Sequence, residues 1–167
     1  HRGSKGKIQR KYETLLHEHR IDYHLSRMIP NFIFDSDDNL IKADWTLFDR
    51  KAGPRISGDY WENSAGLDTY CLDINWVYPG SPYMELSDKK VVEIAREIAR
   101  HFKEKGWFDK LFIYCLDEPH KLYFSRIKKD VELWIQGDAD WRGKFMIVTH
   151  PYHGHSLESV ADIWTIP

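Results

Sequence analysis

The sequence predicts an α/β fold with a parallel sheet, which is either part of a (β/α)8 TIM barrel or a smaller open sheet. In its second half, apolar runs of strand length alternate with helix-length amphipathic segments, which is typical of parallel βαβ units with right-handed crossovers. The most apolar run ends in two carboxylates and a proline, as a buried parallel strand does where it meets solvent. A closed eight-stranded barrel typically takes ~250 residues, whereas this chain has 167. We therefore expect residues 1–167 to form a single domain, which is either part of such a barrel or a smaller open sheet.

The first part of the chain is predicted to hold one helix, one strand and a long connection. Helical spacing of apolar residues predicts an amphipathic helix over residues 7–20, and residues 21–25 (IDYHL) follow as a short strand. The buried face of this helix is expected to carry Ile8, Tyr12, Leu15, Leu16 and His19. Residues 28–68 are rich in Pro and Gly, with a short hairpin or helix expected at residues 40–49. Because this connection follows a strand, we expect it to lie over the active-site end of the barrel, with Trp45 and Phe48 in its core.

The second part of the chain is predicted to alternate strands with helices. A strand at residues 69–77 leads to a helix that Ser87 caps and Gly106 ends. The buried face of that helix is expected at Val91, Ile94, Ala95, Ile98, Ala99 and Phe102. The apolar run at residues 111–116 (LFIYCL) predicts a strand that is buried on both faces.

Pro119 suits the first turn of the helix that follows this strand, because its missing N–H costs nothing there. The buried face of this helix is expected at Tyr123, Ile127, Val131 and Trp134. Further strands are expected at residues 144–150 and 162–166, with a short helix near residues 156–160 between them.

Composition excludes some classes of function. Lys and Arg total 24 against 26 Asp and Glu, a net charge of −2, which argues against a nucleic-acid partner. No apolar run approaches the ~18 residues of a membrane-spanning helix, so membrane insertion is not expected. Cys71 and Cys115 both fall in predicted strands and are expected to be buried thiols. The first residues lack a Met and an apolar signal core, so we expect the chain to begin within a longer protein, whose compartment and oligomeric state stay open.

Asp117 and Glu118 are the candidate catalytic residues. They follow the apolar strand directly, and chemistry in parallel α/β folds sits at the carboxyl ends of strands. Neighbouring residues of a regular strand point to opposite faces, so a shared site requires the backbone to bend there. Two readings stay open. Either Asp117 caps the next helix and Glu118 is solvated, or Glu118 is a proton donor beside an ionised Asp117, the state that like-charge repulsion favours.

Four fragments of the sequence resemble one enzyme family. They are GWFDKLFIYCLDEP at residues 106–119, HEHRI at 17–21, DWTLFD at 44–49 and DIWTIP at 162–167. Together they resemble glycoside hydrolase family 123 and its uncharacterised relatives, which are (β/α)8-barrel β-N-acetylgalactosaminidases. The resemblance spans most of this chain and the central part of the family's catalytic domain, and it therefore implies a partial (β/α)8 barrel.

The resemblance implies retaining, substrate-assisted hydrolysis of a terminal β-linked N-acetylhexosamine, in which the 2-acetamido oxygen of the substrate attacks the anomeric carbon. Glu118 would then be the acid/base and Asp117 would orient the acetamido N–H. The partner implied is a glycan or glycoconjugate, with neither a metal nor an organic cofactor. The choice between galacto- and gluco-configured sugars stays open.

Aromatic and histidine residues near strand ends are the candidate substrate-binding residues. Trp76, Tyr78 and Trp164 are placed to stack on a sugar ring, although each is equally well suited to the core. His150 and Tyr152 are placed near sugar hydroxyls. Asp162 would start the last strand, at the wrong end for catalysis, and Asp73 is expected to make a structural hydrogen bond.

Two other functions stay open. A carbohydrate-binding domain without catalysis would keep the acidic pair. A metal-dependent hydrolase would use His150, His153 and His155, whose spacing suits a zinc site. No carboxylate with ligand spacing accompanies these histidines before Glu158, which favours the metal-free reading.

Overall fold

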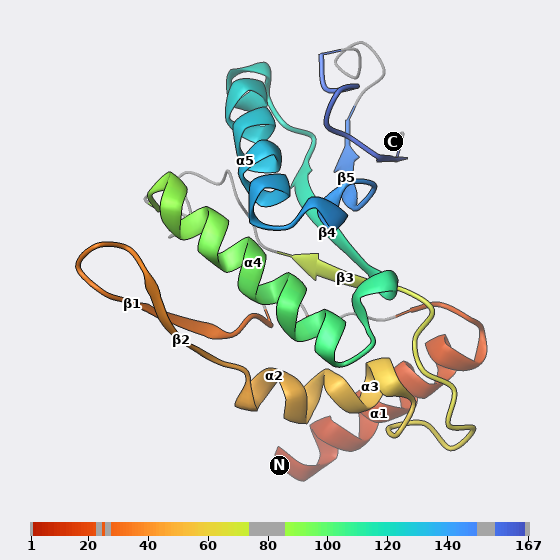
Figure 1. Ribbon diagram of the computed structural model, residues 1–167. Helices are drawn as coiled ribbons and strands as arrows, with labels where there is room; N and C mark the ends of the chain where they lie inside the picture. The colour runs from red at the N-terminus through yellow and green to blue at the C-terminus, as the bar shows by residue number, and fades with distance from the viewer. Residues whose placement is uncertain (1, 23–24, 26–27, 74–85, 150–155, 166–167) are drawn as a thin grey trace.

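The computed structural model describes residues 2–22, 25, 28–73, 86–149 and 156–165 (Figure 1). The helices are α1 (Arg2–Glu18), α2 (Thr46–Lys51), α3 (Gly53–Ser57), α4 (Asp88–Glu104) and α5 (Phe124–Gly137). The strands are β1 (Asn31–Phe34), β2 (Leu40–Asp44), β3 (Tyr70–Asp73), β4 (Leu111–Asp117), β5 (Phe145–Val148) and β6 (Ile163–Thr165). Single turns of 3-10 helix are η2 (Phe108–Lys110), η3 (Lys121–Tyr123) and η4 (Ala139–Trp141). None of the helices described is long and apolar enough to span a bilayer.

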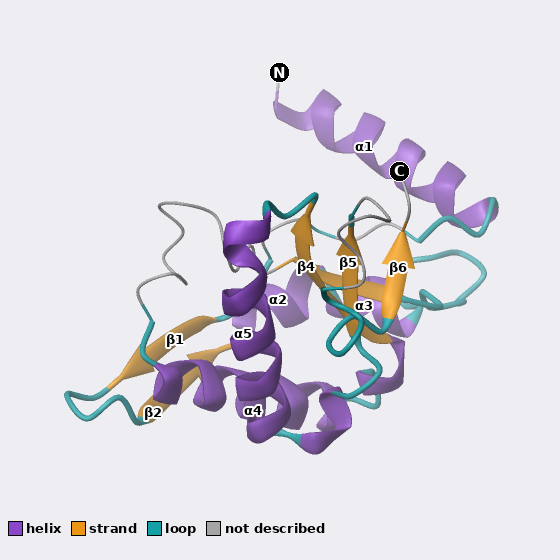
Figure 2. Cartoon of the chain, turned by 90° about the horizontal axis from the view of Figure 1, so that it is seen from above, coloured by secondary structure: helices purple, strands orange, loops and turns teal. Residues whose placement is uncertain are grey.

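The main sheet is parallel and follows the order of the chain, β3-β4-β5-β6. Figure 2 shows β4, β5 and β6 side by side with their arrowheads at the same edge. Helix α4 connects β3 to β4, and α5 connects β4 to β5. These two helices pack against each other on the same side of the strands (Figure 1). The parallel βαβ units expected from the sequence are therefore present.

The predicted (β/α)8 barrel is wrong. The described strands form an open four-stranded parallel sheet and a separate antiparallel pair, β1 with β2, which makes this a small mixed α/β domain. Alternating strands and helices specify parallel pairing and the side on which the helices lie, but closure needs further strands. Within the described residues, β3 and β6 each pair with a single strand, so the sheet has two edges.

Helix α4 matches its prediction closely. The hydroxyl of Ser87 accepts a hydrogen bond from the Lys90 amide at 3.3 Å, and Gly106, at φ +70°, follows the end of the helix. The six residues predicted for its inner face are all buried: Val91, Ile94, Ala95, Ile98, Ala99 and Phe102. Local signals were sufficient here because cap, apolar face and stop residue agree.

The sequence predicted that strand β4 is buried on both faces, but the structure buries only one face fully. Leu111, Ile113 and Cys115 are buried, whereas Phe112 and Tyr114 between them are half-buried. The reason is that α4 and α5 lie on one side of the sheet. The β4–β5 pairing also shifts between Tyr114 and Leu116, which leaves Cys115 as the extra residue of a β-bulge. Cys71 and Cys115 are both buried thiols that form no disulfide, as predicted.

Helix α5 begins later than the position of Pro119 suggested. Pro119 is buried ahead of η3, whose cap is His120, and α5 starts at Phe124. On the predicted inner face, Ile127, Val131 and Trp134 are buried and Tyr123 is half-buried. At the last residue of α5, Gly137 packs so closely on α4 that an added Cβ would lie 2.7 Å from the Val92 carbonyl oxygen.

Helix α1 forms as predicted but turns its apolar side outward. Ile8, Tyr12 and Leu15 are 56%, 65% and 49% exposed, whereas Glu13 is 2% exposed. Glu13 forms an ion pair of 2.7 Å with Arg55 at the end of α3. The predicted inner face is therefore wrong at these three residues and at His19, which is also exposed, while Leu16 is half-buried. Contacts of Glu13 and His17, and not the apolar row, fix α1 to the domain.

The connection at residues 28–68 is more structured than predicted, with the β1–β2 hairpin, α2 and α3. Trp45 and Phe48 are buried, as expected. The hairpin tip reaches the start of α4, where Asp38 accepts a hydrogen bond from Ser87 at 2.6 Å. Helix α3 lies at the amino ends of the strands, since Lys110, just before β4, donates to the carbonyl oxygen of Ile56 at 3.3 Å. The connection therefore does not lie over one end of the sheet. Its hairpin reaches the start of α4, and its α3 part lies at the amino ends of the strands.

Three smaller predictions differ from the structure. Ile21, Asp22 and Leu25 lie outside any strand, and the other two residues of that predicted strand fall outside the described part of the chain. Residues 156–160 form turns and not a helix. The strands predicted at 69–77 and 162–166 are observed as β3 and β6, each of which starts one residue later than predicted, and residues 74–77 and 166 lie outside the described part of the chain.

Candidate active site

Asp117 and Glu118 lie at the carboxyl edge of the main sheet. Asp117 is the last residue of β4, aligned with Val148 of β5, and both carboxylates are exposed. Glu118 has a φ of +43°, in the left-handed region that non-glycine residues rarely adopt. Its amide donates a 2.8 Å hydrogen bond to the carbonyl oxygen of Val148.

A left-handed turn lies at the position where a site shared by Asp117 and Glu118 would require a bend. In a regular strand Asp117 and Glu118 would point to opposite faces, but the backbone leaves the extended conformation between them. Holding a non-glycine residue there costs ~1–3 kcal/mol, which the neighbouring structure must offset. The bulge at Cys115, two residues earlier, distorts the same end of β4.

The following helix is capped by a residue other than Asp117. The imidazole of His120 accepts from the Leu122 amide at 3.4 Å and so caps η3. The reading in which Asp117 serves as this cap is therefore wrong. That reading also expected Glu118 to be solvated. Both Glu118 and Asp117 are exposed in the structure.

The structure does not test the candidate substrate-binding residues. Trp76, Tyr78, His150 and Tyr152 lie outside the described residues, as do His153 and His155 of the alternative zinc site. Trp164 is aligned with Ile147 in the β5–β6 pairing, but its side chain is outside the described part of the structure. The segments that contain these residues follow β3 and β5, the two strands beside β4, or belong to β6.

Thr149 is a residue of this edge that the sequence did not single out. It is 2% exposed and directly follows Val148, whose carbonyl holds Glu118. A polar residue at the end of the neighbouring apolar strand was the available signal. Asp162 lies at the opposite edge, where its carboxylate accepts from the Phe145 amide at 3.2 Å, so its predicted place away from the catalytic end is confirmed.

Among the described residues, no group of three or more His, Cys, Asp or Glu side chains converges as a metal site. A scan against models of known protein families finds no match, and a search of curated proteins finds none. The resemblance to glycoside hydrolase family 123 therefore rests on the four sequence fragments. The geometry adds an exposed pair of adjacent carboxylates at the carboxyl end of a parallel strand.

Proposed function

We propose that this chain carries the catalytic pair of a glycoside hydrolase that removes a terminal β-linked N-acetylhexosamine, with N-acetylgalactosamine as the first candidate. The observation that carries the proposal is the left-handed turn at Glu118, which follows Asp117 at the carboxyl end of β4. Strained backbone of this kind clusters at functional sites. The resemblance of residues 106–119 to the family supplies the substrate class.

The proposed reaction has two steps. In the first, the acetamido carbonyl oxygen of the substrate bonds to the anomeric carbon while the bond to the leaving oxygen breaks. Glu118 gives its proton to that oxygen, and Asp117 accepts a hydrogen bond from the acetamido N–H. In the second step, Glu118 takes a proton from water, whose oxygen attacks the anomeric carbon and opens the oxazoline ring with net retention.

The main competing function is carbohydrate binding without turnover. One observation favours it, namely that both carboxylates are exposed, whereas a general acid works best where water is excluded. A metal-dependent hydrolase is the third candidate, and measuring bound zinc tests it directly.

Release of nitrophenol from p-nitrophenyl β-N-acetylgalactosaminide tests the proposal. Glu118→Gln should lower kcat/KM by ~10²–10⁴, the usual contribution of general acid–base catalysis. Asp117→Asn should also lower it, and the matching β-galactoside without the acetamido group should not be cleaved. Asp109→Asn is the matched control, because Asp109 is an exposed carboxylate at the other end of β4.

Each result separates the candidates. Unchanged nitrophenol release by Glu118→Gln would overturn the catalytic role. Saturable binding of N-acetylgalactosamine without any turnover by the unaltered chain would favour the binding domain.

A further inference from the structure

Helix α1 presents to solvent an apolar row that the described residues leave exposed. Ile8, Tyr12 and Leu15 are 56%, 65% and 49% exposed, and their spacing places them on one face of the helix. Ile21, 53% exposed, comes just past the helix end, where its amide bonds to the Leu16 carbonyl oxygen at 2.9 Å. Three large apolar residues on one helical face are typical of a helix that binds a partner.

The outward direction of this row is fixed by contacts on the opposite side of α1. Glu13 pairs with Arg55 at 2.7 Å, and the His17 ring stacks on Trp61 with 4.1 Å between ring centroids. These contacts hold α1 against α3 and the residues that follow α3, so the helix cannot turn its apolar row inward without breaking a buried ion pair.

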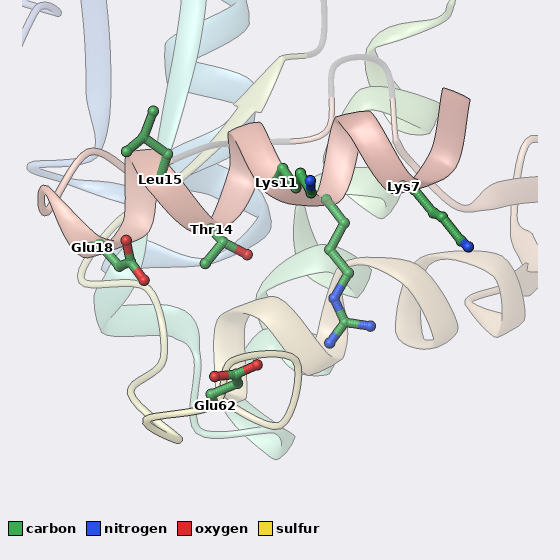
Figure 3. A pocket seen from close by; sticks show the side chains of 7 residues that line it. Lys7, Lys11, Thr14, Leu15, Glu18 and Glu62 are labelled. Carbon is green, nitrogen blue, oxygen red and sulfur yellow. The ribbon is translucent and has the colours of Figure 1, made fainter. Parts of the chain in front are cut away.

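A groove of about 600 Å³ runs along α1 beside the apolar row (Figure 3). The basic and acidic side chains that line this groove lie toward opposite ends of α1. Lys7, Arg10 and Lys11 line one half, and Glu18 and Glu62 line the other. Figure 3 shows Lys7 near one end of the helix and Glu18 at the other.

We propose that this face binds a second copy of the same chain, with the two α1 helices antiparallel about a two-fold axis near Tyr12. At 1.5 Å per residue, Ile8 lies ~6 Å before Tyr12 and Leu15 lies ~4.5 Å after it. An antiparallel pair therefore sets Ile8 of each copy against Leu15 of the other. The same symmetry brings Lys7 of each copy close to Glu18 of the other.

Charge complementarity selects a second copy as the occupant. The pattern is basic at one end and acidic at the other, so it matches itself when reversed, as a two-fold interface requires. A parallel pair would instead place the basic ends of the two grooves at the same end of the interface. A uniformly acidic or basic partner would meet like charge at one end of the groove, which disfavours binding.

This interface is separate from the proposed active site. Helix α1 packs on α3, and Lys110 at the start of β4 donates to the Ile56 carbonyl oxygen of α3. The interface therefore lies toward the amino ends of the strands, while Asp117 and Glu118 lie at their carboxyl ends. Glycosidase activity and self-association can consequently fail independently.

The mass of the chain in solution tests the proposal. One helix face buries less surface than the 1,200–2,000 Å² of a standard protein–protein interface, so we expect a weak dimer. The average mass in solution should therefore rise as the protein concentration increases from about 10 µM to about 1 mM. Tyr12→Glu should raise the dimer Kd at least tenfold. Ile41→Glu is the matched control, since Ile41 is an apolar residue of β2 that is 65% exposed.

Charge reversal tests the antiparallel arrangement. Lys7→Glu and Glu18→Lys should each weaken the dimer, and the double variant should recover much of the lost affinity, because each exchanged charge again faces its opposite. A disulfide between two copies of Tyr12→Cys, with none in Ile41→Cys, would support the symmetry axis. A chain that stays monomeric to about 1 mM, or single reversals without effect on Kd, would overturn the proposal.

Discussion

The amide of Glu118 donates to the carbonyl oxygen of Val148 across 2.8 Å, although the φ of Glu118 is +43°. This bond extends the contact between β4 and β5 by one residue past the end of β4. It therefore helps to hold a glutamate in a conformation that favours glycine, next to the other carboxylate of the candidate active site.

Residue 118 should show a conflict between stability and activity. Glu118→Gly should raise the free energy of unfolding by up to about 1 kcal/mol, because glycine adopts a positive φ without the steric cost. Glu118→Val should lower it, because a branched Cβ fits this region worst. Urea unfolding measures both changes, with Glu118→Gln as the reference of nearly unchanged stability. A glycine variant less stable than the valine variant would contradict this account.

The buried Glu13–Arg55 pair should be costly to break from one side. Glu13→Ala should lower the free energy of unfolding by about 3 kcal/mol, since Arg55 would keep its charge without the buried carboxylate that now pairs with it. The double variant Glu13→Leu with Arg55→Met should lose much less, because no unpaired charge stays buried. Unfolding followed by circular dichroism compares the three chains. If the single and double variants lost the same free energy of unfolding, the interaction between Glu13 and Arg55 would not be the source of the loss.

His101 should make stability depend on pH near neutrality. Burial lowers the pKa of His101 below its ordinary value of 6.5, although Asp49, 2.7 Å away, partly opposes this. The unfolded chain then takes up a proton before the folded one, so stability is complete above about pH 6.5 and is lost as pH falls below it. Unfolding free energies at about pH 7.5 and about pH 5.5, where most carboxylates stay ionised, measure the loss. His101→Gln should reduce the difference between the two values, and an unchanged difference would exclude His101 as its source.

Gly137 should be intolerant of a side chain. An added Cβ would lie 2.7 Å from the Val92 carbonyl oxygen and 2.8 Å from the Ala95 Cβ, so Gly137→Ala should push α5 away from α4 and cost about 1–3 kcal/mol. Gly6→Ala is the contrasting control, because nothing lies within 4 Å of its added Cβ. Alanine is the better helix former, so Gly6→Ala should be neutral or stabilising by up to about 1 kcal/mol. Thermal unfolding of both variants checks the pair of expectations.

Local signals predicted the parts of the fold in which neighbouring residues carry the information. Helix α4 had its cap at Ser87, its apolar face and its stop at Gly106 all in one stretch of sequence. The position of Asp117 at a strand end followed from the apolar run before it. These features do not depend on what the rest of the chain does.

Features that depend on distant partners were missed. The apolar spacing of α1 predicts a helix, but the ion pair between Glu13 and Arg55 decides which side faces the domain. The left-handed turn at Glu118 accompanies a hydrogen bond to β5, thirty residues along the chain, and glutamate gives no local sign of it. Barrel closure depends on strands that would pair with the edges of the sheet, and the alternation of elements does not specify them.

The order β3-β4-β5-β6 has a consequence for synthesis of the protein. In the described part of the chain, β3, β4 and β5 each pair with the strand that comes next, so none of them waits for a much later segment before it finds a partner. The β3–α4–β4 unit can therefore fold as soon as β4 leaves the ribosome, and β5 and β6 then add in turn to a preformed edge. Because Glu118 bonds to Val148, we expect its turn to be fixed only once β5 has emerged and docked, so the candidate catalytic pair matures late in translation.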